Sequence, residues 1–296
     1  MSIITTSVHS PFLSLGPTNA IRVYKKLLPS DGFVCGRLSS FQCCCRGKDD
    51  DPATHQGFSI LKTNAQVDIG NVWSSVGFYV FGIHVPLSFG GLSAAAKLLQ
   101  QPLLNPQIAA FLLLGIQTLE LGIVLLLLKR PGKPQYDLAD FFHGSKSSKG
   151  RSILLGVALG FGFLSSLVFI TSYFAEILIG SKDANDPFVK DVLCSSSSSI
   201  VCSVLVYSIV TPLLEEVVYR GFLLTSLAAS DMEWRQAVAL SSLAFSAAHF
   251  SGENFLQLFI VGIVLGSSYC WTGNLAAPLA IHSLYNSLIM LSVFIS

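Results

Sequence analysis

Two adjacent carboxylates, Glu215 and Glu216, precede an arginine, Arg220, inside an otherwise apolar stretch. The twenty residues before Glu215 (195–214) hold no charged side chain. Ionisable groups at membrane depth are energetically costly, and they are usually retained for a function. Glu216 and Arg220 are four residues apart, so on a helix they share a face and can pair. Glu215 is rotated by about 100° from Glu216, which leaves it free to face another partner and handle a proton.

Two later apolar segments contribute histidines. Phe245 and His249 form a Phe-x-x-x-His pattern, whereas His282 and Asn286, also four residues apart, project from one helix face. Imidazole and carboxamide groups buried in a bilayer need hydrogen-bond partners or a water-filled cavity. One shared cavity would satisfy all of these groups together: Glu215, Glu216, Arg220, His249, His282 and Asn286. The alternative is that the Glu–Arg pair and each histidine only fix the packing of helices.

Such a group of side chains has the parts needed to hydrolyse an amide. A carboxylate and a histidine can take a proton from water and pass one to the leaving amine. An asparagine and a second histidine can donate hydrogen bonds to the developing oxyanion. Since no serine or cysteine has a recognisable nucleophile setting, we expect direct attack by water and no cofactor. Zinc is the alternative, because two histidines and a carboxylate match a common ligand set, although the HExxH pattern is absent.

The composition predicts an all-α, polytopic membrane protein. The 296 residues are 51% hydrophobic and only 12% charged, whereas soluble domains are roughly 25% charged. The mean hydropathy is +0.62. The net charge of +1 indicates no nucleic-acid partner. The expected partners are the lipid bilayer and a membrane-associated peptide or protein substrate.

A membrane span needs about 20 apolar residues, and this length predicts about seven transmembrane helices with the site inside the bundle. Proline at position 212 should kink the fourth of these helices, which is too long for one simple span. The basic loop 129–151, with six Lys or Arg, should lie on the cytosolic or stromal side. Glycines four residues apart, at 156 and 160 and again at 262 and 266, favour close helix contact. The expected spans are 72–91, 108–128, 152–180, 189–227, 237–250, 255–271 and 275–294.

The first 50 residues differ from the rest of the chain. Residues 1–48 contain seven Ser, three Thr and six Lys or Arg but one acid, Asp31. This composition is typical of an organelle transit peptide that is disordered and removed. We therefore expect residues 1–50 to be a leader and the mature protein to lie in a chloroplast membrane, with another organelle membrane as the alternative. Residues 56–190 should form the N-terminal transmembrane helices, and residues 191–296 a helical core that carries the candidate site.

In this order, Glu-Glu-x-x-x-Arg (215–220), Phe-x-x-x-His (245–249) and His-x-x-x-Asn (282–286) resemble the CAAX protease and bacteriocin-processing (CPBP, Abi-type) family of intramembrane endopeptidases. The resemblance covers roughly residues 200–291 and, together with the leader, indicates a plant organelle-targeted member. It implies that the core domain 191–296 is catalytic and that Glu215 with His249 activates the attacking water without a metal. It further implies that Glu216 and Arg220 support this pair, while His282 and Asn286 polarise the scissile carbonyl.

Two other functions are compatible with the sequence. A non-proteolytic membrane scaffold could keep the fold and aid assembly or turnover of other membrane proteins. A proton-coupled transporter could use Glu120, Glu215 and the histidines as a relay, although the inverted-repeat pattern of such proteins is missing. Replacing Glu120 with glutamine should matter only for the transporter.

Overall fold

The regular structure of the described part of the chain is entirely helical, which confirms the predicted all-α class. The expected transit peptide and most of the basic loop 129–151 lie outside the described residues. The computed structural model describes residues 58–61, 67–101, 104–129, 138–143, 151–179, 190–192, 195–230 and 232–295.

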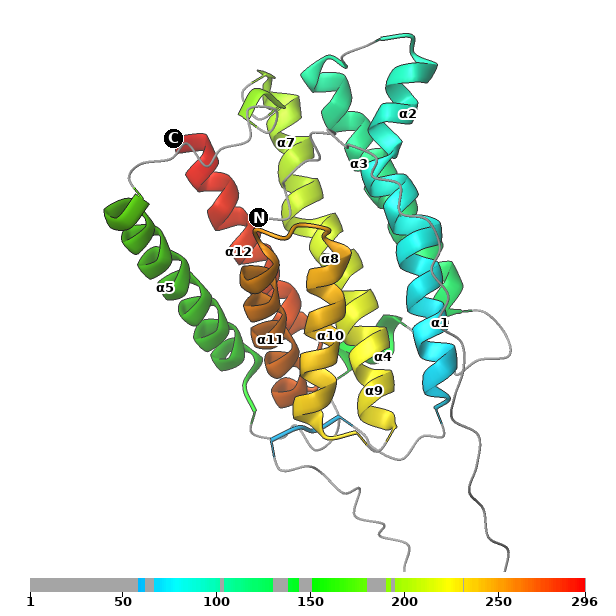
Figure 1. The fold of residues 1–296 in the computed structure, drawn as a ribbon, viewed down its shortest axis with the longest axis vertical. Helices are drawn as coiled ribbons and strands as arrows, with labels where there is room; N and C mark the ends of the chain where they lie inside the picture. Colours follow the sequence, from blue (N-terminus) through cyan, green and yellow to red (C-terminus); the bar gives the residue numbers. More distant parts are fainter. Residues whose placement is uncertain are drawn as a thin grey trace, which may run out of the picture. The chain divides into compact units, whose positions relative to one another are not determined.

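The helices α1, α2 and α3 lie to one side of the late helices in Figure 1, whereas α5 packs beside α11 and α12. Several segments have π-helical winding, and these are labelled η. In chain order the elements are α1 (Ile69–Tyr79), η1 (Val80–Phe89), α2 (Gly91–Leu98), α3 (Pro106–Leu128), α4 (Leu138–Phe142), α5 (Ile153–Ile179), α7 (Ser197–Leu205), η3 (Val206–Val210), α8 (Thr211–Glu216), η4 (Val217–Leu224), α9 (Thr225–Ala229), α10 (Trp234–Ala248), α11 (Phe255–Thr272) and α12 (Ala276–Ile295).

Six helices of the described part are long and apolar enough to cross a membrane, one fewer than the seven expected. The expected span that is missing from these six is 237–250. It corresponds to α10, whose 15 residues are shorter than the roughly 20 that a bilayer requires. The six candidate spans are Ile69–Phe89, Pro106–Leu128, Ile153–Thr171, Ser197–Ala229, Phe255–Thr272 and Ala276–Ile295.

The fourth span, Ser197–Ala229, is a composite of 33 residues that runs from α7 to α9. Pro212 begins α8, directly after the π-helical segment η3. A proline inside a helix lacks the N–H that would bond to residue i−4, so the surrounding backbone must change its pattern of hydrogen bonds. The wide turns of η3 and η4 on either side of α8 fit this requirement.

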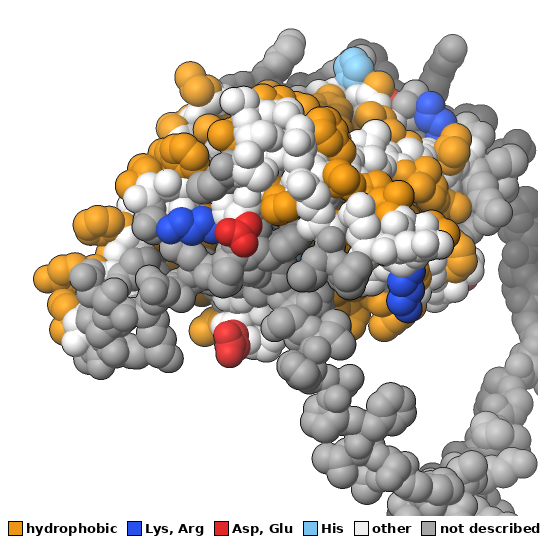
Figure 2. Space-filling view, turned by 90° about the horizontal axis from the view of Figure 1, so that it is seen from above, with side chains coloured by type: hydrophobic (Ala, Val, Ile, Leu, Met, Phe, Trp, Pro, Cys, Tyr) orange, Lys and Arg blue, Asp and Glu red, His pale blue; other side chains and the backbone are white. Residues whose placement is uncertain are grey.

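The outer surface is apolar, as a lipid-facing surface must be. Hydrophobic side chains dominate the described surface in Figure 2, and charged side chains are few. Phe81, Leu154 and Phe169 are each about two-thirds or more exposed. In water such exposure would be unfavourable, whereas in a bilayer these side chains contact lipid.

Close helix contacts hold the late helices together at the predicted glycines. A Cβ on Gly262 of α11 would lie 2.8 Å from the Cβ of Ser242 on α10. A Cβ on Gly160 of α5 would lie 2.5 Å from Cδ1 of Ile281 on α12. At position 262 a larger residue would collide with the Cβ and Cα of Ser242, whereas at position 160 the end of the Ile281 side chain could shift; both close approaches fit the predicted role of the small residues.

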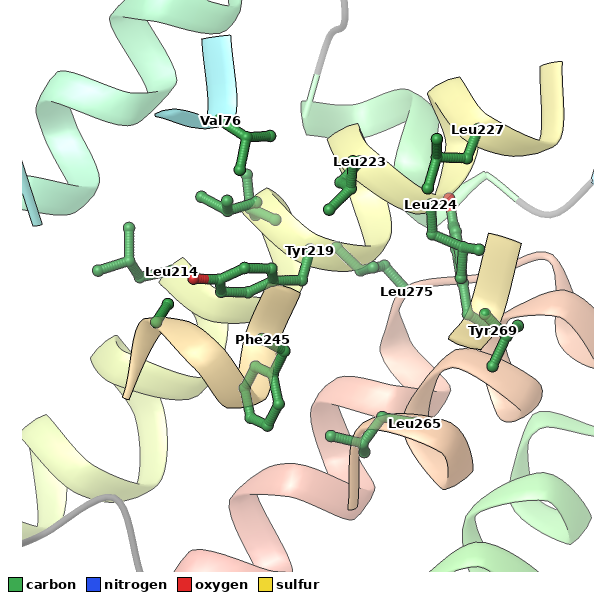
Figure 3. Close-up of a cluster of buried hydrophobic side chains, with 14 of the residues drawn as sticks. Val76, Leu214, Tyr219, Leu223, Leu224, Leu227, Phe245, Leu265, Tyr269 and Leu275 are labelled. Atoms are coloured by element: carbon green, nitrogen blue, oxygen red, sulfur yellow. The ribbon is translucent and has the colours of Figure 1, made fainter. Parts of the chain in front are cut away.

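A core of buried apolar side chains supports the segment α8–η4. Figure 3 shows Tyr219 pointing toward Leu214, with Phe245 of α10 nearby. The rings of Tyr219 and Phe245 meet edge to face, with centroids 5.4 Å apart. Because these side chains are almost fully buried, the backbone that carries Glu215, Glu216 and Arg220 is held rigidly.

Candidate active site

Glu216 and Arg220 form the ion pair that their spacing predicts. Nη1 of Arg220 lies 2.9 Å from Oε1 of Glu216, and both side chains are essentially inaccessible. The guanidinium also lies over the ring of Phe245, 4.5 Å from its centroid, and donates to the carbonyl of Gly262 at 3.4 Å. Arg220 therefore ties η4 to both α10 and α11, and it neutralises one of the two adjacent carboxylates.

His282 of α12 lies between the two glutamates. Its Nδ1 is 2.8 Å from Oε1 of Glu216, and its Nε2 is 3.4 Å from Oε2 of Glu215. An ionised Glu216, paired with Arg220, can only accept hydrogen bonds, so the network assigns a proton to Nδ1 of His282. The Nε2 atom of this imidazole is then left to exchange a proton with Glu215.

His249 reaches Glu215 from the C-terminal end of α10. Its Nδ1 lies 2.7 Å from the carbonyl oxygen of Phe245, and its Nε2 lies 3.5 Å from Oε1 of Glu215. A carbonyl only accepts, so Nδ1 of His249 must carry a proton. Both histidines thus present Nε2 to Glu215. A proton shared among these three groups can be taken up and returned, which is the requirement for general acid–base chemistry.

Three of the five buried side-chain atoms without a hydrogen-bond partner among the described residues lie in this cluster. They are Oε2 of Glu215, Oε2 of Glu216 and Nε of Arg220. Buried polar groups are nearly always paired, and exceptions often coincide with functional sites. The orphaned oxygen of Glu215 lies on the same carboxylate that the two histidines flank.

Asn286 is the one predicted site residue that does not contact the glutamates. It is buried one helical turn beyond His282 on α12. Its Nδ2 donates a hydrogen bond to the carbonyl of Tyr207 in η3 at 3.0 Å. The structure therefore brings five of the six predicted side chains into one connected cluster and places the sixth beside it.

The zinc alternative requires Glu215 and the two histidines to converge, and they do converge. Among the described residues, however, no group of three or more His, Cys, Asp or Glu side chains is arranged so that it could hold a metal ion.

Sequence reasoning missed a second buried polar cluster in the first half of the chain. Glu120 of α3 is completely buried and lies 2.8 Å from Nδ1 of His84 in η1. Tyr79 and Ser88 also donate hydrogen bonds to Glu120. The available signal was the occurrence of a histidine and a glutamate inside separate apolar spans, but nothing in the sequence paired them.

Comparisons with known proteins match the segment that holds these residues. Residues 197–288, which hold all six predicted residues, match the family model described as "Type II CAAX prenyl endopeptidase Rce1-like". The chain is 26% identical over 146 residues to "Membrane-embedded CAAX protease MroQ" of Staphylococcus aureus, covering 48% of this chain and 58% of that protein. It is 29% identical over 118 residues to an "Uncharacterized 24.3 kDa protein" of Escherichia coli, covering 37% and 54%. No solved structure matches.

The chain thus spans somewhat more than half the length of the curated relatives it matches. The segment 197–288 is similar to CAAX-type membrane endopeptidases, which agrees with the family resemblance expected from the three motifs. The similarity is located in the segment from α7 to α12, where the candidate active site lies.

Proposed function

We propose that this protein is an intramembrane peptidase that hydrolyses a peptide bond of a membrane-associated substrate with water activated by Glu215 and His249. One observation carries the proposal: Glu215 is buried within a candidate membrane span and is flanked by the Nε2 atoms of His249 and His282. Its support is that this arrangement lies within the segment that matches CAAX-type endopeptidases.

The mechanism begins with a water molecule beside the orphaned oxygen of Glu215. The Glu215–His249 pair takes a proton from this water as its oxygen attacks the scissile carbonyl. The ion pair of Glu216 and Arg220 holds His282 through Nδ1, which fixes the direction of its Nε2. Glu216, Arg220 and the Phe245 carbonyl are therefore positioning groups, whereas Glu215 and His249 handle the proton.

One N–H of Asn286 is bound to the Tyr207 carbonyl, and its carboxamide carries a second donor hydrogen. If this second N–H polarises the scissile carbonyl, Asn286→Ala should lower kcat about 10²–10³-fold and change KM little. Steady-state kinetics of the purified variant provides the measurement. A change confined to KM would instead assign Asn286 to substrate binding or packing.

The substrate is proposed from the relatives. The matching model is named for prenyl endopeptidases, and the S. aureus relative is called a CAAX protease. A peptide bond near a prenylated cysteine is therefore the first substrate to test. We also propose that residues 56–190 form the N-terminal helical domain and that residues 191–296 form the catalytic core.

We further propose that residues 1–50 are a removable leader that directs the protein to a chloroplast membrane. The Ser-rich, basic and acid-poor composition of this segment supports the proposal. A fusion of residues 1–50 to a fluorescent protein should enter chloroplasts of plant cells and be shortened there. Import into another organelle would show that the leader has a different destination. A full-length fusion that stays in the cytosol would contradict the proposal that residues 1–50 are a leader.

The function can be tested with the purified full chain in lipid nanodiscs. A quenched fluorescent peptide with a prenylated cysteine should be cleaved, and the same peptide without the prenyl group measures how much the lipid contributes. Cleavage should persist in a strong metal chelator, because Glu215 and His249 need no metal in this mechanism. Loss of activity with the chelator and recovery with Zn²⁺ would establish the zinc alternative, whereas cleavage of neither peptide would contradict the proposed activity.

A further inference from the structure

The second buried cluster is centred on Glu120, in the middle of α3. Glu120 accepts hydrogen bonds from the hydroxyls of Tyr79 at 3.0 Å and Ser88 at 2.8 Å, and it lies 2.8 Å from Nδ1 of His84. Gln117, one turn earlier on α3, donates to Ser88 at 2.9 Å. All of these residues lie outside the segment 197–288, so the family match assigns them no role.

The π-helical winding of η1 creates this cluster. Tyr79 and His84 are five residues apart, and on an α-helix they would point about 140° away from each other. In the structure their side chains touch, with the Tyr79 hydroxyl 3.3 Å from Nδ1 of His84. A π-helix bonds residue i to i+5, and its turns occur frequently at functional sites. The winding around Pro86 thus directs Tyr79, His84 and Ser88 to Glu120.

The hydrogen bonds determine which nitrogen of His84 is open. An ionised Glu120 only accepts, so Nδ1 of His84 must carry the proton that faces it. The Ser88 hydroxyl gives its single proton to Glu120 and therefore accepts from Gln117. Nε2 of His84 has no hydrogen-bond partner among the described residues, and the side chain is 15% exposed. A carboxylate on Nδ1 that fixes the tautomer and leaves Nε2 open is the arrangement of an acid–base histidine.

Two aromatic contacts link His84 to the residue that follows His249 of the candidate active site. The ring of His84 contacts Phe89, with centroids 5.9 Å apart, and Phe89 contacts Phe250, with centroids 5.5 Å apart. Phe250 directly follows His249 and has a left-handed backbone, with φ of 49°, which is strained for a bulky residue. The helix α3 also packs against α8.

In the described active site, the groups that take the proton from water would also have to give one to the leaving amine. Both of its histidines have Nδ1 bound and Nε2 directed at Glu215. We propose that His84, oriented by Glu120, is a further acid–base residue, which gives the leaving amine its proton. This inference rests on the proposed peptidase function and adds a proton donor from the first half of the chain.

Bonds and protons balance in the proposed step. Water forms a bond to the carbonyl carbon, and its proton passes to the Glu215–His249 pair. The C–N bond then breaks while the nitrogen takes the proton from Nε2 of a doubly protonated His84, which remains hydrogen-bonded to Glu120 through Nδ1. The Glu215–His249 pair returns its proton to His84 through solvent. One peptide bond and one water have become a carboxylic acid and an amine.

The test compares two substrates with the same prenylated sequence in nanodiscs, one with a scissile amide and one with a thioester. A thiolate leaves without prior protonation, whereas an amine does not. His84→Gln should slow amide cleavage about 10²–10⁴-fold and thioester cleavage far less, and Glu120→Gln should show the same selectivity. Glu215→Gln should slow both substrates. Added imidazole should restore amide cleavage by His84→Ala, whereas thiazole, similar in shape but a much weaker base, should not.

The role of His84 would be overturned if His84→Gln slowed cleavage of the amide and the thioester equally, or slowed neither. Either result would leave the peptidase function intact. Cleavage of neither substrate by the unchanged protein would overturn the peptidase function itself, and unchanged cleavage by Glu215→Gln would exclude Glu215 as the proton acceptor. Gln107→Leu, an exposed change on the same helix, controls for general effects on α3. If His84→Gln does not accumulate, Glu120→Gln gives the same comparison.

A role in transport is a separate outcome. If Glu120→Gln abolished proton transport but left amide cleavage intact, the cluster would be assigned to transport and the inference would be overturned.

Discussion

Glu215→Gln should reduce the rate of peptide hydrolysis about 10²–10⁴-fold, because the variant keeps the shape of the side chain but removes the group that accepts the proton of water. The loss should appear in kcat. His249 and His282 would retain their Nδ1 partners, the Phe245 carbonyl and Glu216. The measurement is steady-state cleavage of the reporter peptide by purified protein in nanodiscs.

Glu253→Gln is the matched control, since Glu253 is exposed and lies in the turn before α11. It should cleave at the rate of the unchanged protein. Thermal unfolding in detergent checks that Glu215→Gln remains folded. Full activity of Glu215→Gln would exclude Glu215 as the proton acceptor.

Arg220→Met should be the most destabilising single substitution in the site. It would leave Glu216 buried without its cation and remove the guanidinium from Phe245 and the Gly262 carbonyl. Removing one partner of a buried pair typically costs about 3–5 kcal/mol. Denaturant-induced unfolding in mixed micelles, followed by tryptophan fluorescence, measures the change in the free energy of unfolding.

A double substitution separates the lost pair from the lost packing. Glu216→Gln combined with Arg220→Met removes the charge on Glu216, so it should be more stable than Arg220→Met alone. The double variant should nevertheless hydrolyse slowly, because His282 would lose the anionic partner of its Nδ1. A double variant as unstable as Arg220→Met would show that the guanidinium acts through packing alone.

Local spacing predicted the parts of the site that depend on a single helix. Glu216 and Arg220 pair as their four-residue separation indicates, although the helix changes from α to π winding between them, at the junction of α8 and η4. The convergence of His249 and His282 on Glu215 followed from the physical need to satisfy polar groups in a bilayer. The contact of Asn286 with Tyr207 did not follow, because it depends on how α12 packs against η3.

The second cluster could not be predicted for a related reason. A sequence read with the 3.6-residue period places Tyr79 and His84 on different faces, and only the π-helical turn brings them together. Their pairing with Glu120 further depends on the packing of η1 against α3. The number of spans was overestimated because α10 continues the apolar pattern but has only 15 residues, too few to cross a bilayer alone.

The central claim, that Glu215 activates water for peptide hydrolysis in a membrane, is tested most directly in cells. The N- and C-terminal peptides of membrane proteins can be compared between cells that carry the intact protein and cells that carry Glu215→Ala at equal abundance. The account predicts that defined termini disappear and that their uncut precursors accumulate. Unchanged termini, with altered abundance of membrane complexes, would contradict hydrolysis and favour the scaffold.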